Sequence, residues 1–148
     1  MITGAQSLDV PAAQDLVFAR LADIAAYPSW QSFVTDADVR DTDGEGRATL
    51  VEARLDAKVT ALKATLRYAY HGAEKVSWTY VDGDLKDMHG SFTLATGAAG
   101  AGSTAVTMDV AVDPGFRLGL LLRGPVEGKV RNAVLDGTLR GLAATFTT

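Results

Sequence analysis

Residues 51–59 read Val-Glu-Ala-Arg-Leu-Asp-Ala-Lys-Val, and residues 62–70 read Leu-Lys-Ala-Thr-Leu-Arg-Tyr-Ala-Tyr. Apart from Ala69, each run alternates apolar with polar residues, which is the two-residue period of a strand with one buried face. The alternation in the first run is typical of a half-buried antiparallel strand, and the second run repeats its period, so the two long strands should pair. We therefore predict a half-buried antiparallel sheet in the middle of the chain.

Further strand-like runs lie on the C-terminal side of this pair, at residues 76–81, 88–94 and 104–112. Turn residues separate them: His71-Gly72, Asp82-Gly83, and a Gly/Ala-rich loop at residues 96–103. The sequence thus predicts a series of strands joined by short connections, in the manner of an antiparallel sheet.

Helical periodicity marks both ends of the chain. Near the start, residues 11–23 form an apolar stripe, and Asp23 can cap a short second turn at residues 24–27 that ends before Pro28. Near the end, apolar residues recur at helical spacing from about residue 116 to residue 146. We predict one long helix there, kinked at Pro125 because proline removes a backbone donor and clashes with the preceding turn.

This order predicts an α+β fold. A curved antiparallel sheet of about six or seven strands should wrap around the long C-terminal helix, with two short helices after the first strand. The length of 148 residues, with 47% hydrophobic and 22% charged residues, fits one globular domain spanning residues 1–148.

Composition excludes several classes of function. The chain has no cysteine, which removes thiol nucleophiles and thiolate zinc sites and favours a reducing compartment. The net charge of −4 counts against nucleic acid as a partner. The first ten residues do not read as a secretory signal, and the longest aliphatic run, residues 118–122, is too short for a membrane span. We expect a cytoplasmic monomer or homodimer without stable membrane insertion.

Several short motifs carry a resemblance to a known family. Residues 17–23 read Val-Phe-Ala-Arg-Leu-Ala-Asp, and residues 27–30 read Tyr-Pro-Ser-Trp. Further short motifs of the same kind lie at residues 76–78, 90–94 and 102–106. Together they resemble the polyketide cyclase/dehydrase and lipid-transport (SRPBCC) superfamily over essentially the whole chain. The resemblance implies the helix-grip fold of START and birch-pollen-allergen-like proteins, with an apolar cavity between sheet and helix.

The physical reason for a cavity is independent of that resemblance. A sheet bent around a helix rarely fills its whole concave side, and the small inward residues Ala53, Ala57, Ala64 and Gly90 enlarge the space. Trp30 should lie in a loop near the entrance. The alternative is that the same side chains make a packed core. The candidate ligand-binding residues are Trp30, Phe33, Leu55, Leu66, Tyr68, Tyr70, Trp78, Tyr80, Phe92, Met108, Leu122 and Val126.

Catalytic residues are harder to assign. The two histidines, His71 and His89, have no metal-ligand spacing around them, so we expect neither a bound metal nor another cofactor. His71 precedes a glycine and is interpreted as a solvated turn residue. The remaining candidates for proton transfer are His89, Asp87 and Tyr80.

The direction in which His89 points depends on strand register. The apolar alternation of Met88 and Phe92 turns His89 outward, and we favour this register because a buried apolar set fixes register strongly. A strict two-residue hairpin at Asp82-Gly83 would instead place His89 opposite Val76, inside with Asp87. A bulge between Asp84 and Asp87 would reconcile the two patterns.

Three functions are compatible with these patterns. The first is binding or transport of a hydrophobic small molecule, such as a lipid, a quinone or a polycyclic or polyketide-like metabolite. The second is a metal-independent polyketide aromatase/cyclase or dehydratase, which needs acid/base groups inside the cavity. The third is an interaction protein whose pocket is vestigial. We rank them in this order because no catalytic motif is present.

Overall fold

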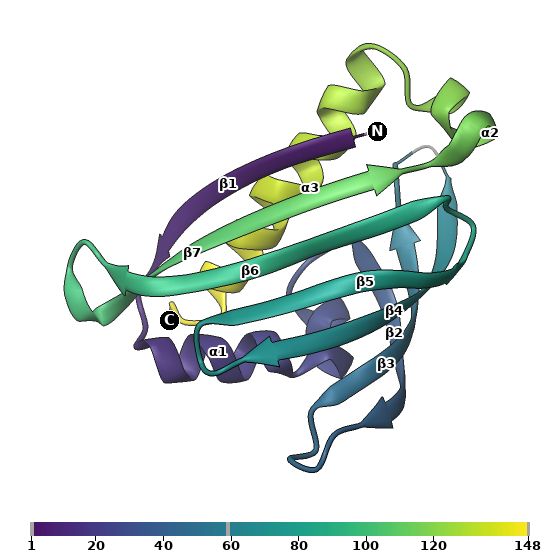
Figure 1. Ribbon diagram of the computed structural model, residues 1–148. Helices are drawn as coiled ribbons and strands as arrows, with labels where there is room; N and C mark the ends of the chain where they lie inside the picture. The colour runs from purple at the N-terminus through teal and green to yellow at the C-terminus, as the bar shows by residue number, and fades with distance from the viewer. Residues whose placement is uncertain (1, 59, 148) are drawn as a thin grey trace.

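The computed structural model describes residues 2–58 and 60–147. Its elements are, in chain order, β1 (Ile2–Val10), α1 (Gln14–Ala22), the 3₁₀ helix η1 (Ile24–Ser29), β2 (Val34–Thr42), β3 (Ala48–Asp56), β4 (Ala61–His71), β5 (Lys75–Gly83), β6 (Asp87–Gly97), β7 (Gly100–Asp113), α2 (Gly115–Leu121) and α3 (Pro125–Ala144) (Figure 1). The predicted order of elements is confirmed.

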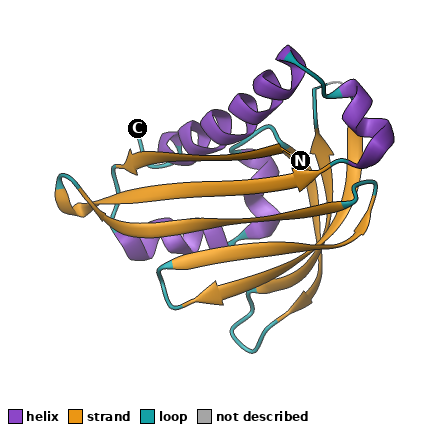
Figure 2. Cartoon of the chain, turned by 45° about the horizontal axis from the view of Figure 1, so that its top comes forward, coloured by secondary structure: helices purple, strands orange, loops and turns teal. Residues whose placement is uncertain are grey.

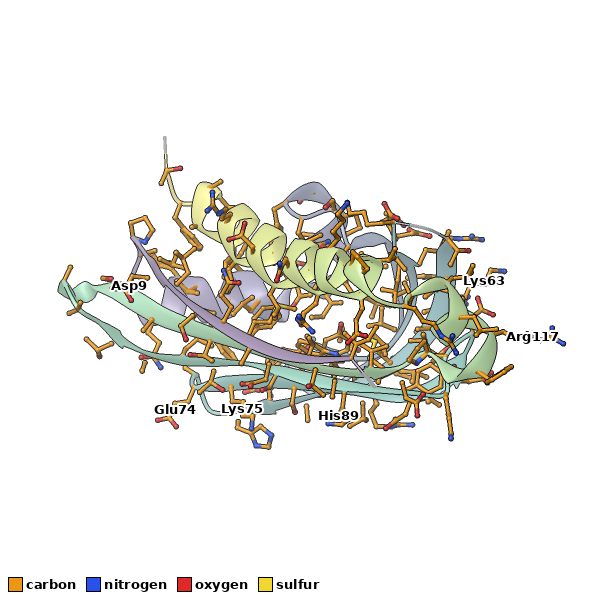
Figure 3. All side chains as sticks on the ribbon, turned by 90° about the horizontal axis from the view of Figure 1, so that it is seen from above. Asp9, Lys63, Glu74, Lys75, His89 and Arg117 are labelled. Carbon is orange, nitrogen blue, oxygen red and sulfur yellow. The ribbon has the colours of Figure 1, made fainter. Side chains whose placement is uncertain are left out.

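The seven strands form one antiparallel sheet in the order β1-β7-β6-β5-β4-β3-β2. The sheet is curved; α1, η1 and α3 lie on one side of it, and α2 lies at its end, beyond β7 (Figures 2 and 3). This is the predicted α+β arrangement of a bent sheet around a C-terminal helix. The strand predicted at residues 51–59 ends earlier, at Asp56, and Val59 lies outside the described residues.

Helix α3 packs onto the concave face of the sheet. Its buried side chains recur every three or four residues, as a single apolar stripe requires; they are Val130, Val134, Leu135, Thr138, Leu139 and Leu142. None of the helices in the described ranges is long and apolar enough to cross a membrane. The largest fully buried side chains come from the sheet, from α1 and η1, and from α3, so these layers share one core.

The prediction of one kinked helix from about residue 116 to residue 146 is wrong in one respect. Pro125 does not kink a continuous helix; it is the first residue of α3, and α2 ends at Leu121. Gly124 between them has a φ of 61°, which is outside the right-handed helical region. A helical conformation is already disfavoured for a residue that precedes proline, and glycine readily adopts the positive φ found here. The two effects together separate α2 from α3.

Two predicted boundaries near the start also shift. Helix η1 continues through Pro28 to Ser29, and Asp23 occupies its N-cap position without a side-chain hydrogen bond to the helix. The predicted loop at residues 96–103 is much tighter than expected, because β6 extends to Gly97 and β7 begins at Gly100.

Candidate functional site

Two small voids lie between the sheet and α3, and they adjoin because both are lined by Phe33, Leu55 and Met88. The α2-side void measures about 40 Å³, and its other lining residues are Ile2, Ala57, Leu62, Leu85, Val110, Val112, Leu122, Val130, Arg131 and Val134. The Trp78 void measures about 30 Å³, and its other lining residues are Tyr27, Gln31, Val34, Leu66, Tyr68, Trp78, Phe92, Met108 and Thr138.

Each void is large enough for a water molecule, which needs roughly 10 to 15 Å³ of such space, but it is small. The pockets that hold drug-sized ligands measure about 300 to 1,000 Å³. The expected apolar space between sheet and helix therefore exists, but in this conformation most of it is filled by side chains.

The polar groups beside the Trp78 void differ in whether they already have partners. The Gln31 amide donates to the backbone oxygens of Tyr27 and Val34, at 2.8 Å each, and its oxygen accepts from Val34 N. The Tyr27 hydroxyl donates to the Leu21 carbonyl. These groups are satisfied within the protein and are not available to a ligand.

Trp78 and Tyr68 are different. The indole nitrogen of Trp78 is buried and has no hydrogen-bond partner among residues 2–58 and 60–147. Burial raises the pKa of the Tyr68 hydroxyl well above its ordinary value, so this group stays a neutral hydroxyl at neutral pH. An unpaired buried donor costs free energy, so the Trp78 indole keeps an unused hydrogen-bonding group. Trp30 Nε1 is also buried without a partner in the described residues, but Trp30 lines neither void.

The strand register explains how Trp78 reaches this position. Trp78 on β5 lies opposite Gly90 on β6, and a Cβ atom at Gly90 would overlap both the Trp78 ring and the Asp109 carbonyl oxygen. Only glycine therefore lets the indole lie on the sheet. The Phe92 ring is 5.3 Å from the Trp78 ring, centroid to centroid, so the void has an aromatic wall.

Eight of the twelve candidate ligand-binding residues line one or both voids: Phe33, Leu55, Leu66, Tyr68, Trp78, Phe92, Met108 and Leu122. Trp30 and Val126 line neither. The Trp30 ring packs edge-on against Tyr27 at 5.0 Å, and Val126 lies half-buried in the first turn of α3. Trp30 lies in the turn after η1, as predicted, next to Gln31, which lines the Trp78 void; its place near an entrance stays a prediction.

The other two candidates, Tyr70 and Tyr80, use their hydroxyl groups elsewhere. The Tyr70 hydroxyl donates to the Ala48 carbonyl at 2.6 Å, and burial raises its pKa to about 12. The Tyr80 hydroxyl accepts a 3.1 Å hydrogen bond from the Leu85 backbone. Neither side chain is among the lining residues of the voids.

Sequence reasoning missed other lining residues, among them Met88, Leu85, Val130 and Val134. The apolar stripe of the C-terminal helix and the alternation around Met88 contained the signal for three of them. Leu85 lies in the connection between β5 and β6, where no period indicates which side chains point inward.

His89 and Asp87 lie on the outer face of the sheet, with side chains 57% and 54% exposed. Thr79 pairs with His89, and Val76 pairs with Phe92, so the outward register of His89 is confirmed. His89 Nδ1 and Asp87 Oδ2 are 3.8 Å apart, so this ion pair forms between two solvent-exposed groups. An acid/base role inside the cavity required an inward-facing His89, and the structure does not meet that condition.

The strict two-residue hairpin that was the alternative for His89 is absent, because β5 and β6 stop pairing at Thr79 and His89. Beyond Thr79, β5 continues to Gly83 along β4, with a register shift between Thr65 and Leu66. His71, at the end of β4, is exposed as expected. Within the described part of the chain, no three His, Asp or Glu side chains gather where they could hold a metal ion.

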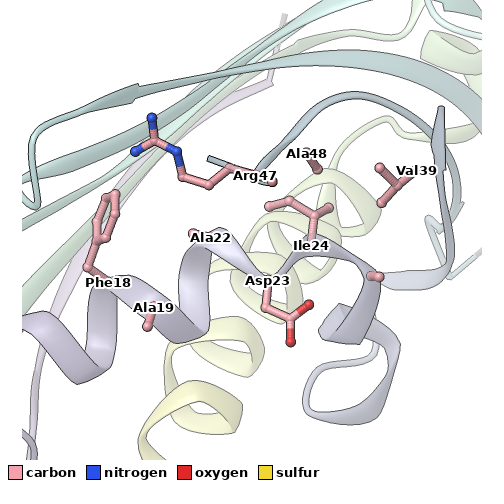
Figure 4. A pocket seen from close by; sticks show the side chains of 10 residues that line it. Phe18, Ala19, Ala22, Asp23, Ile24, Val39, Arg47 and Ala48 are labelled. Carbon is pink, nitrogen blue, oxygen red and sulfur yellow. The ribbon is translucent and has the colours of Figure 1, made fainter. Parts of the chain in front are cut away.

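A larger, open groove of about 510 Å³ lies between the α1–η1 segment and the β2–β3 hairpin (Figure 4). Arg47 in this groove is already paired, at 2.9 Å with Asp43 and 2.6 Å with Glu45. Its guanidinium also lies 4.6 Å from the centre of the Tyr70 ring, and the Asp23 carboxylate points away from it (Figure 4). Because the charge of Arg47 is satisfied and the space is open to water, the interior is the stronger candidate site.

Comparison with protein families identifies one match. The family described as polyketide cyclase/dehydrase and lipid transport matches residues 10–138. No curated protein matches the sequence.

Solved structures show the same fold at low sequence identity. A START superfamily protein from Mycobacterium smegmatis is similar with a TM-score of 0.82 and 16% identity, over 97% of this chain and 95% of that one. The Zhui aromatase/cyclase from Streptomyces sp. R1128 is similar with a TM-score of 0.64 and 17% identity, over 97% and 87%. Major latex-like protein 151 from Panax ginseng is similar with a TM-score of 0.69 and 14% identity, over the full length of both chains.

Proposed function

The chain belongs to the polyketide cyclase/dehydrase and lipid transport family, and from this premise we propose that it binds a hydrophobic small molecule between the sheet and α3. The ligand class is a lipid, a quinone or a polycyclic, polyketide-like metabolite. One of the similar structures is an aromatase/cyclase, which supports the last of these classes.

One observation carries the proposal: two adjoining apolar voids lie between the sheet and α3, and one of them is lined by Trp78, whose buried indole N–H has no acceptor among the described residues. Fully packed cores rarely leave such a donor unpaired. A ligand carbonyl or ether oxygen beside Trp78 would satisfy it, while the apolar body of the ligand would occupy the two voids.

A ligand of this class needs more space than the voids provide, so the lining must move. Leu85 and Leu122 close the α2-side void, and both lie in connections between regular elements. Connections open at lower free energy than sheet strands do. The α2 end is therefore the proposed entrance.

Binding without turnover is the function that we propose. Neither void has a His, Asp or Glu among its described lining residues, and the one charged lining residue is Arg131. For an aromatase/cyclase or dehydratase reaction the described lining offers no base: the pKa of the Tyr68 hydroxyl is raised, which suits this group to donate a hydrogen bond but not to accept a proton.

Filling the α2-side void should weaken binding. Ala57 is buried and lines this void, so Ala57→Val places two added methyl groups in the space that the ligand would use. We expect a stability change within about 1.5 kcal/mol, because the void accommodates part of the added volume. Affinity for decylubiquinone, anthraquinone or palmitate, measured by calorimetry, should fall at least about tenfold for whichever probe binds, equivalent to roughly 1.4 kcal/mol.

Ala69→Val is the matched control. Ala69 is exposed on β4, outside both voids, so its added methyl groups should leave affinity unchanged. Equal affinity in the Ala57→Val variant and the wild-type protein would place the binding site elsewhere, with the open groove beside α1 as the next candidate.

A further inference from the structure

Helix α2 exposes more large apolar side chains than any other element. Five large apolar side chains are exposed in the described residues, and three of them lie on this seven-residue helix: Phe116 at 82%, Leu120 at 46% and Leu121 at 53%. No residue of α2 is buried. Clustered exposed apolar residues on a soluble protein mark an interaction surface more often than scattered ones do.

Basic residues accompany this apolar cluster. Residues 114–131 contain four of the 14 basic residues of the chain and one of its 18 acidic residues. That segment therefore carries a charge of +3, in a chain whose net charge is −4. This segment of the sequence is therefore basic, with Asp113 directly before it, where its carboxylate accepts a hydrogen bond from Gly115 N.

Arg117 lies within the apolar cluster, between Phe116 and Leu120 in the sequence, and Arg123 follows Leu121 by two residues. Both are exposed, and neither takes part in an ion pair within residues 2–58 and 60–147. Arg117 projects away from the body of the protein at the end that holds α2 (Figure 3). By contrast, Arg40, Arg47 and Arg140 are each held by a carboxylate.

We propose that α2 docks on the surface of an anionic lipid bilayer. Phe116, Leu120 and Leu121 would enter the boundary between headgroups and acyl chains, and Arg117 and Arg123 would lie among the anionic headgroups. A short helix that combines exposed aromatic and aliphatic residues with arginine is suited to this interface. The docked state is peripheral and requires no membrane-spanning helix.

Charge favours the bilayer over a second copy of the chain. A symmetric dimer formed through α2 would bring each α2 surface against its own equivalent. Arg117 and Arg123 of both copies would then lie in one interface, which gathers four cations there and is unfavourable. An anionic bilayer neutralises both.

The position of α2 also suits such docking. Gly115 and Gly124, at either side of the helix, have φ values of 80° and 61°, so glycine bounds the segment at both ends. The docking proposal does not depend on ligand binding in the interior.

Vesicle co-sedimentation tests the proposal. Vesicles of three parts phosphatidylcholine to one part phosphatidylglycerol should bind the protein, and vesicles of phosphatidylcholine alone should bind it at least about fivefold more weakly, because the two arginines lose their anionic partners. Added salt should weaken binding to the mixed vesicles. The double variant Phe116→Ser/Leu121→Ser should bind at least about tenfold more weakly to the mixed vesicles, because it loses most of the apolar area available for insertion.

Two further variants complete the test. Leu16→Ser/Val81→Ser removes two similarly exposed apolar side chains outside α2 and should bind as the wild-type protein does. Arg117→Gln/Arg123→Gln should reduce the preference for phosphatidylglycerol. Absence of binding to the mixed vesicles, or equal loss in both serine variants, would overturn the proposal. A wild-type dimer that the Phe116→Ser/Leu121→Ser variant dissociates would overturn it as well, in favour of a second copy as the occupant.

Discussion

Replacing Leu135 by alanine is expected to lower the free energy of unfolding by about 2 to 5 kcal/mol. Leu135 is 4% exposed and lies in the middle of α3, and its Cδ1 atom packs close to Gly4 of β1. The glycine allows the helix to approach the strand closely, so truncation of Leu135 leaves a cavity that the rigid strand cannot fill. In a thermal melt the midpoint should fall by roughly 5 to 15 °C for a chain of this length.

Leu16→Ala provides the comparison. Leu16 is 56% exposed on α1, so the same chemical change should alter stability by no more than about 0.5 kcal/mol. If the Leu135→Ala variant melts at the same temperature as the wild-type protein, α3 is peripheral and the sheet does not depend on it for a core.

Gly141→Ala should also destabilise the protein, by about 1 to 3 kcal/mol, although alanine ordinarily has a higher helix propensity than glycine. A Cβ atom at Gly141 would overlap the backbone oxygen of Trp30. Backbone cannot move aside as a flexible side chain can. The substitution must therefore push the C-terminal part of α3 away from the segment that follows η1.

Gly137→Ala lies on the same helix and should have the opposite sign. A Cβ atom at Gly137 would meet nothing within 4 Å, so the variant should gain about 0.5 to 1 kcal/mol from the reduced conformational entropy of the unfolded chain. Chemical denaturation of the two variants beside the wild-type protein measures both effects. Equal stabilisation by both substitutions would mean that the close approach at Trp30 is not present in solution.

The sequence predicts those parts of the fold where one periodicity continues unbroken. β3 and β4 each keep a strict alternation over most of their length, and both are found in the structure. α3 keeps a helical stripe over several turns, and it packs on the sheet as expected. A long, regular spacing of apolar residues shows both the type of element and which of its faces points into the core. These elements could therefore be recognised from the sequence alone.

β2 shows why other elements could not be recognised. Its pairing with β3 contains register shifts between Val34 and Asp36 and between Val39 and Asp41. Each shift changes which residues point inward, so the alternation along the strand is lost. Its many acidic residues also lie on an exposed face, where hydropathy indicates no strand.

The candidate site is predictable only in part, for a similar reason. Strand parity places Leu66, Tyr68 and Trp78 on the concave side, where they line the Trp78 void. Parity cannot show that Tyr70, on the same face, bonds to Ala48 and lies outside the voids, because that depends on where the concave face ends. The volume left between sheet and helix depends on the rotamers of many side chains, and no local pattern specifies it.

The central claim is that the interior binds a hydrophobic ligand, and tryptophan fluorescence tests it most directly. The chain has two tryptophans: Trp78 lines a void, and Trp30 lines neither. Titration with polycyclic aromatics, quinones and fatty acids should change the emission saturably for at least one class. Trp78→Phe should remove most of this change, and Trp30→Phe should retain most of it. If no class gives a saturable change and calorimetry detects no binding, the interior is a packed core and the claim is wrong.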